Sequence, residues 1–71
     1  SYVASLQKKG QDRILQKIGE EASEVIIAGK NNNKKMIISE MADLWFHLLV
    51  FLAAKNIPPE KIIMELEKRN K

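Results

Sequence analysis

The sequence predicts an all-α fold, a helical bundle of about four helices per chain that is completed by homodimerisation. Two observations predict this class. Apolar residues recur with helical spacing, and no segment shows the alternation of a strand. Residues 34–55 also contain no Pro or Gly and are apolar on nearly every side, as in a buried helix. The 71 residues form one small domain, residues 1–71, which buries only about 60% of its unfolded surface.

The apolar surface of residues 34–55 exceeds what the other short helices can cover, so we expect a homodimer. The chain has no cysteine, and neither disulfides nor thiolate metal sites can stabilise it. The lack of cysteine and of an export signal predicts a cytoplasmic protein. The longest uninterrupted apolar run, Leu48–Ala54, is too short to span a bilayer, so we expect no membrane partner.

The first two helices are predicted at residues 2–9 and 11–30. Ser1 can cap the first, and Gly10 can end it. Gly19, inside the second helix, costs about 1 kcal/mol against Ala and often marks close approach of a backbone or ligand. The predicted core stripe of the second helix consists of Ile14, Leu15, Ile18, Ala22, Val25 and Ile26.

The third and fourth helices are predicted at residues 34–55 and about 59–70. Asn31–Asn33 forms a loop that supplies an N-cap for the third helix, and Asn56 can end that helix in the left-handed conformation. Pro58 and Pro59 open the last helix. Its apolar face is Ile62, Ile63 and Leu66, and Glu65 and Arg69 form an i, i+4 pair.

Two carboxylate pairs at i, i+3 spacing point to a metal site. Glu21 and Glu24 lie on the second helix, and Glu40 and Asp43 on the third. If the helices pack antiparallel, the four carboxylates converge, and two of them about 4 Å apart repel by about 4 kcal/mol. A divalent cation relieves this repulsion, and oxygen ligands select Mg²⁺ or Mn²⁺. Such an ion takes phosphate oxygens as further ligands, which predicts metal-assisted hydrolysis of a phosphate substrate.

Other interpretations stand beside this one. A single E-x-x-E pair on a helix is usually a solvated face, and His47 on an apolar helix fits a hydrogen-bonded core residue better than a metal ligand. The aromatic residues Trp45, Phe46 and Phe51 fit a core or dimer interface better than a base-stacking platform. A di-iron site would need Glu-x-x-His on two helices, and the second helix has no His.

The basic residues allow two functions. The net charge of +3 suits either nucleic acid or a small phosphorylated substrate. Converging carboxylates would repel a nucleic-acid backbone, so we expect no nucleic-acid partner. Lys17 lies one turn before Glu21 and can form either an internal salt bridge or a contact to a substrate phosphate.

Four sequence strings resemble those of the phosphoribosyl-ATP pyrophosphohydrolases, a family of all-α nucleotide pyrophosphohydrolases related to MazG-type proteins and dimeric dUTPases. They are S-Y at 1–2, K-x-G-E-E-A-x-E-V at 17–25, E-x-A-D-L-x-x-H-x-x-V at 40–50 and E-L-x-x-R at 65–69. Members usually carry another helix before the S-Y start. Val3 and Ser5 stand where the family has Thr and a longer polar residue, so the chain departs from the family at the N-terminal edge of the substrate pocket.

The resemblance implies a homodimer that binds Mg²⁺ through Glu21, Glu24, Glu40 and Asp43. It implies hydrolysis of the α–β phosphoanhydride of phosphoribosyl-ATP to phosphoribosyl-AMP and pyrophosphate, the second step of histidine biosynthesis. We predict that Lys17 and Arg13 neutralise substrate phosphates and that Glu20 or Glu24 takes the proton of the attacking water. The alternatives are a MazG-like nucleoside triphosphate pyrophosphohydrolase with the same site and a non-enzymatic helical dimerisation module.

Overall fold

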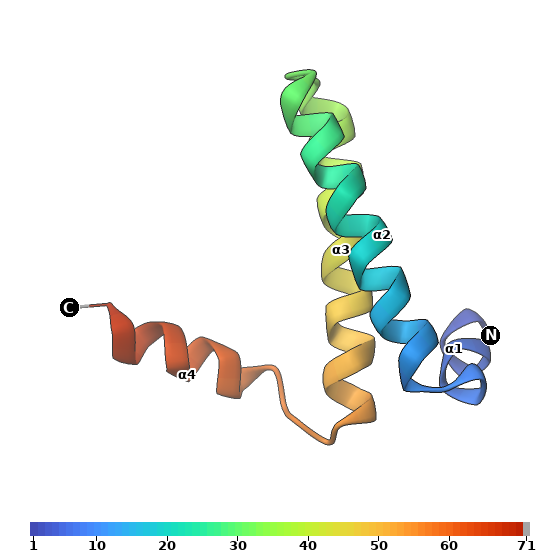
Figure 1. Ribbon diagram of the computed structural model, residues 1–71. Helices are drawn as coiled ribbons and strands as arrows, with labels where there is room; N and C mark the ends of the chain where they lie inside the picture. Colours follow the sequence, from blue (N-terminus) through green and yellow to red (C-terminus); the bar gives the residue numbers. More distant parts are fainter. Residues whose placement is uncertain (71) are drawn as a thin grey trace.

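The computed structural model describes residues 1–70, which form four α-helices and no strand. They are α1 (Tyr2–Lys9), α2 (Gln11–Lys30), α3 (Lys34–Ala54) and α4 (Glu60–Arg69). α2 and α3 form a long antiparallel hairpin, α1 packs at the foot of α2, and α4 projects away from the hairpin (Figure 1). The predicted all-α class and the four helices are confirmed.

The helix ends follow the capping residues read from the sequence. The Ser1 side chain accepts a hydrogen bond from the Ala4 N–H at 3.2 Å, and Asn33 Oδ1 accepts one from the Met36 N–H at 3.1 Å. Gly10 turns the chain between α1 and α2 with φ of 96°, and Asn56 has the predicted left-handed conformation with φ of 57°.

Three predicted boundaries are wrong by one residue, namely the end of α3 and both ends of α4. α3 ends at Ala54, and Lys55 follows it as the C-cap. The Lys55 N–H donates hydrogen bonds to the Phe51 and Leu52 carbonyls in the last turn of the helix. α4 runs from Glu60 to Arg69, because Pro59 and Asn70 are its caps and lie only half within the helix.

The core lies where α1, the start of α2 and the end of α3 meet. Its buried members are Leu6, Ile14 and Val50, one from each of these helices. Val3, Ile18 and Phe51 are partly buried and pack against this cluster. The core therefore fixes the position of α1 and holds the start of α2 against the end of α3.

The predicted core stripe of α2 is only partly correct. Ile14 is 1% exposed, but Leu15 is 41% exposed and Ile26 is 65% exposed. Within one chain α3 is not buried on every side, since Ile38 and Trp45 are 71% and 64% exposed, and its apolar surface exceeds what the other helices cover, as expected. The reason is geometric: in a two-helix hairpin each helix buries one narrow stripe. The predicted bundle is not closed within the chain, and α4 has no buried residue.

The length and composition of α3 also bear on the expected absence of a membrane partner. The helix is long and apolar enough to cross a membrane, so the prediction that the short run Leu48–Ala54 excludes a membrane span is wrong. Average hydropathy over a whole helix, rather than an uninterrupted run, decides this property. One such helix is weak evidence of a membrane span, because the core helix of a soluble protein can have the same length and composition.

Candidate metal and phosphate site

Three carboxylates come together halfway along the hairpin. Glu21 of α2 and Glu40 and Asp43 of α3 each offer an oxygen, and these oxygens all lie within 4.8 Å of one another. Glu21 and Glu40 are half-buried, whereas Asp43 is exposed. The antiparallel pairing of α2 with α3 produces this meeting. The carboxylate spacing predicted that four carboxylates converge, and three of them do. A set of three carboxylate oxygens suits a hard divalent cation.

The charges around Glu40 oppose its ionisation. Burial raises the pKa of Glu40 above its ordinary value of 4.5, and the negative charges of Glu24, Asp43 and Glu21 raise it further. Glu40 is therefore close enough to the other three predicted ligands for their negative charges to oppose its ionisation. A cation bound here would reverse the effect, because it favours the charged carboxylate.

Glu24 stands apart from the three-carboxylate group. It is exposed, and with Glu40 it lines a hollow of about 100 Å³ towards the loop end of the hairpin. The other lining residues are Ile27, Ala28, Asn31, Asn33 and Met36. No basic group of residues 1–70 forms an ion pair with Glu24. This position is compatible with both roles predicted for Glu24, that of metal ligand and that of base.

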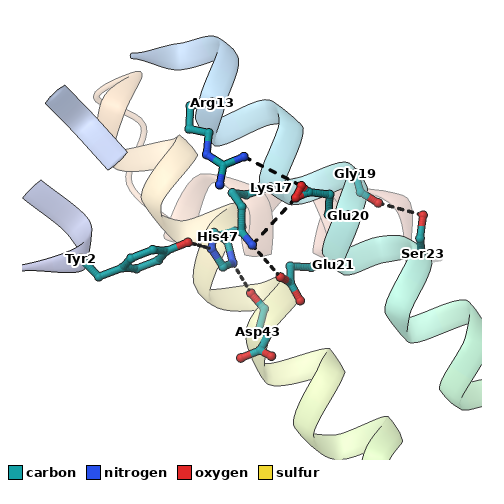
Figure 2. Close-up of polar contacts among 9 residues, drawn as sticks. All are labelled: Tyr2, Arg13, Lys17, Gly19, Glu20, Glu21, Ser23, Asp43 and His47. Atoms are coloured by element: carbon teal, nitrogen blue, oxygen red, sulfur yellow. Dashed lines mark hydrogen bonds and ion pairs between the residues drawn. The ribbon is translucent and has the colours of Figure 1, made fainter. Parts of the chain in front are cut away.

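The two basic side chains predicted to bind phosphate, Lys17 and Arg13, lie beside Glu20 and Glu21 on α2 (Figure 2). Lys17 Nζ is 3.2 Å from Glu21 Oε1 and 4.0 Å from Glu20 Oε1, and Arg13 Nη1 is 3.9 Å from Glu20 Oε2. A hydrogen bond to Glu21 raises the pKa of Lys17 more than burial lowers it. The internal salt bridge considered for Lys17 is therefore present, and Glu20 lies among cations outside the carboxylate group.

His47 is a hydrogen-bonded core residue, as the sequence favoured. It is 5% exposed, its Nδ1 lies 2.7 Å from the backbone oxygen of Asp43, and its Nε2 lies 2.8 Å from the Tyr2 hydroxyl (Figure 2). A carbonyl oxygen only accepts, so Nδ1 donates its proton and Nε2 accepts from Tyr2. This places α1 against α3 beside the carboxylates.

The role of Tyr2 was missed by reasoning from the sequence. In the sequence Tyr2 stands out only as part of the S-Y motif, and its partner His47 is 45 positions away. Its ring also stacks on Phe46, with 6.0 Å between ring centres. A tyrosine so early in the chain gives no local signal of such a contact, and the motif was the one available clue.

The predicted close approach at Gly19 is not made by residues 1–70. A Cβ placed on Gly19 would meet no atom within 4 Å. The Ser23 hydroxyl donates to the Gly19 carbonyl at 3.0 Å, which is an interaction within the helix (Figure 2). The open space leaves room for a ligand or a second chain beside this turn of α2.

Comparison with known proteins places the chain in a family. The family model described as phosphoribosyl-ATP pyrophosphohydrolase matches residues 1–70. The chain is 54% identical to the phosphoribosyl-ATP pyrophosphatase of Bacillus mycoides, over 99% of this chain and 65% of that protein. It is 58% identical to the protein of the same name from Methanocella arvoryzae, over 100% of this chain and 77% of that protein.

A third relative, the phosphoribosyl-ATP pyrophosphatase of Geobacter metallireducens, is 55% identical over 97% of this chain and 63% of its own length. The chain thus spans about two thirds of the length of the curated relatives it matches. The matched region contains α1 to α4 and every residue of the candidate site. The chain therefore belongs to the phosphoribosyl-ATP pyrophosphohydrolase family.

Proposed function

We propose that the chain hydrolyses the α–β phosphoanhydride of phosphoribosyl-ATP and releases phosphoribosyl-AMP and pyrophosphate in a Mg²⁺-dependent reaction. The observation that carries the proposal is the convergence of Glu21, Glu40 and Asp43 in a chain of this family. Both the substrate and the place of the reaction in histidine biosynthesis follow from the family. The reaction is that of a soluble small-molecule enzyme, for which the cytoplasm is the proposed location.

The donor set fits the proposed Mg²⁺. All the predicted ligands are carboxylates, namely Glu21, Glu24, Glu40 and Asp43, and hard oxygen donors select Mg²⁺ or Mn²⁺ over softer metals. The raised pKa of Glu40 fits too, because it reflects burial and the negative charges of Glu24, Asp43 and Glu21. No basic group of residues 1–70 forms an ion pair with Glu40. When bound, the ion would supply Lewis acidity towards the phosphate oxygens and the attacking water.

Side chains of α2 have the remaining roles. Lys17 and Arg13 would neutralise phosphate oxygens, and both already lie beside acidic groups at the edge of the site. Glu20 and Glu24 are the two candidates for taking the proton of the attacking water. Glu20 faces Arg13 and Lys17, whereas Glu24 opens onto the hollow beside Glu40. This difference favours Glu24 as the base.

We also propose that the chain acts as a homodimer, whose second copy closes the bundle. α3 presents Ile37, Ile38, Met41, Ala42 and Trp45 around a hollow of about 280 Å³ that has no charged residue in its lining. Ile62, Ile63, Met64 and Leu66 of α4 are 47–58% exposed. Apolar surface of this extent is expected to be covered, and a second copy supplies the matching surface by symmetry.

The decisive experiment is pyrophosphate release from phosphoribosyl-ATP with and without Mg²⁺, with ATP and dUTP in parallel. Metal-dependent release from phosphoribosyl-ATP alone supports the proposal. Release from the nucleoside triphosphates instead would identify a MazG-like enzyme with the same site. No release from any substrate, together with a stable dimer, would favour the non-enzymatic dimerisation module.

A further inference from the structure

Lys17 and Glu21 form the most protected ion pair of the described residues. Their side chains are 20% and 13% exposed, whereas those of the shorter Arg69–Glu65 pair are 74% and 49% exposed. Solvent and salt therefore screen the Lys17 pair less than the pair on α4. The raised pKa of Lys17 has the same origin, since its largest cause is the hydrogen bond to Glu21.

Glu21 has two competing uses. The oxygen that Lys17 contacts belongs to the same carboxylate that lies within 4.8 Å of Glu40 and Asp43. An ammonium group and a divalent cation held by this one carboxylate would repel each other at short range. The chain's own cation therefore competes with the proposed metal ion for Glu21.

A second acceptor lies within reach of Lys17. Glu20 Oε1 is 4.0 Å from Lys17 Nζ, on the more exposed side of the same helix. Glu20 and Glu21 follow Lys17 at i+3 and i+4, so a rotation of the lysine side chain suffices to leave Glu21. No movement of the backbone is needed. The departure also turns the ammonium group towards solvent, where the phosphates of a bound substrate would lie.

We propose that Lys17 is an internal counter-ion that occupies Glu21 in the metal-free protein, leaves it when the metal ion binds, and then pairs with a phosphate group of the substrate. This inference rests on the proposed function and extends it. Before the metal arrives, Lys17 offsets one of the negative charges of the three carboxylates. The exchange also links phosphate binding to the presence of the metal. Lys17 is thus a competitor of the metal and a partner of the substrate.

The test compares Mn²⁺ binding by the wild-type chain, Lys17→Met, Lys17→Arg and the control Lys61→Met. Free Mn²⁺ is measured by electron paramagnetic resonance without substrate. The control removes the same charge from exposed α4, and circular dichroism checks that each variant is folded. We expect Lys17→Met to bind Mn²⁺ about three- to tenfold more tightly, since a partly shielded ion pair contributes about 1 kcal/mol. Lys17→Arg and Lys61→Met should stay near wild type.

The second readout is the binding of inorganic pyrophosphate to the Mn²⁺-loaded proteins by calorimetry. We expect Lys17→Met to bind it about tenfold more weakly, because one charge-assisted contact is lost. Tighter Mn²⁺ binding together with weaker pyrophosphate binding supports the exchange. Unchanged or weaker Mn²⁺ binding, or unchanged pyrophosphate binding, overturns it while the proposed function stands. A wild-type chain that binds no Mn²⁺ overturns the exchange and the proposed metal site together.

Discussion

The Tyr2–His47 hydrogen bond is the one polar side-chain contact that ties α1 to α3, and Tyr2→Phe removes it with little else changed. The ring remains, and with it the packing on Phe46 and His47. The Nε2 atom of His47 then has no partner in a residue that is 5% exposed. An unsatisfied buried acceptor costs about 1–3 kcal/mol. In a domain of this size each kcal/mol lowers the Tm by roughly 4–8 °C.

The assay is thermal unfolding by circular dichroism at one fixed protein concentration, because oligomerisation would make the Tm depend on concentration. Tyr2→Phe is compared with wild type and with Tyr2→Leu, which also loses the ring contacts and should be less stable still. A Tm for Tyr2→Phe equal to that of wild type would refute the assignment of this bond as a stabilising contact.

The tautomer of His47 gives a second and independent check. The chain contains one His, so its ring nitrogens are assigned without ambiguity in a ¹⁵N-labelled sample. The contact to the Asp43 carbonyl predicts a proton on Nδ1 and a bare, accepting Nε2 in the neutral ring. The opposite tautomer would contradict the geometry, because Nδ1 would then face a carbonyl oxygen with no proton between them.

The other predictions concern the metal, the core and the dimer. Asp43→Asn should abolish Mg²⁺-dependent pyrophosphate release with helical content unchanged, whereas Asp12→Asn, an exposed control, should not. Mn²⁺ affinity should fall on acidification through the raised pKa of Glu40, because the metal needs the carboxylate. Ile14→Ala should lower the free energy of unfolding by about 3 kcal/mol in urea titrations. Trp45→Lys should raise the dimer dissociation constant at least about tenfold in sedimentation.

Each of these has a contradicting result. Full activity of Asp43→Asn would remove that residue from the metal site, and Mn²⁺ affinity that does not vary with pH would contradict the proton competition at Glu40. A loss below about 1 kcal/mol for Ile14→Ala would mean that the small core is loosely packed. A matched Gln16→Lys change on exposed α2 should leave the dimer intact, and equal weakening by both changes would contradict an interface at Trp45.

The protonation of Glu40 also affects the fold. Its pKa is raised in the folded chain, so between 4.5 and the raised value the folded state holds the proton more tightly than the unfolded state. The sign follows: stability of the metal-free protein decreases as the pH rises through that window. Urea titrations across the window, with and without Mn²⁺, should show the decrease, and saturating metal should reduce it. Stability that instead rises with pH would contradict the assignment.

Sequence alone was sufficient wherever the governing interaction was local. The ends of the helices follow from Ser1, Gly10, Asn33 and Asn56, since each of these residues satisfies backbone groups within its own turn. The i, i+3 spacing of Glu40 and Asp43 places both on one face of a helix for the same local reason. The short loop between two long helices then made an antiparallel hairpin the natural arrangement.

Burial and pairing needed the tertiary structure. Leu15 and Trp45 have apolar character whether or not a neighbour covers them, and only the packing of α2 on α3 decides that both remain exposed in this chain. The contact of Tyr2 with His47 joins residues that are 45 positions apart in the chain. The difference between Glu21 and Glu24 depends on the rotation of α2 against α3, which the helical period alone does not specify.

The sequence by itself thus determined the helices, their caps and the face on which the acidic residues lie, because these depend on interactions within about one helical turn. The tertiary structure decided which three carboxylates meet, which of them Lys17 neutralises, and which apolar surfaces await a partner. Those outcomes depend on distances between residues far apart in the chain, and such distances are set by the way the helices pack.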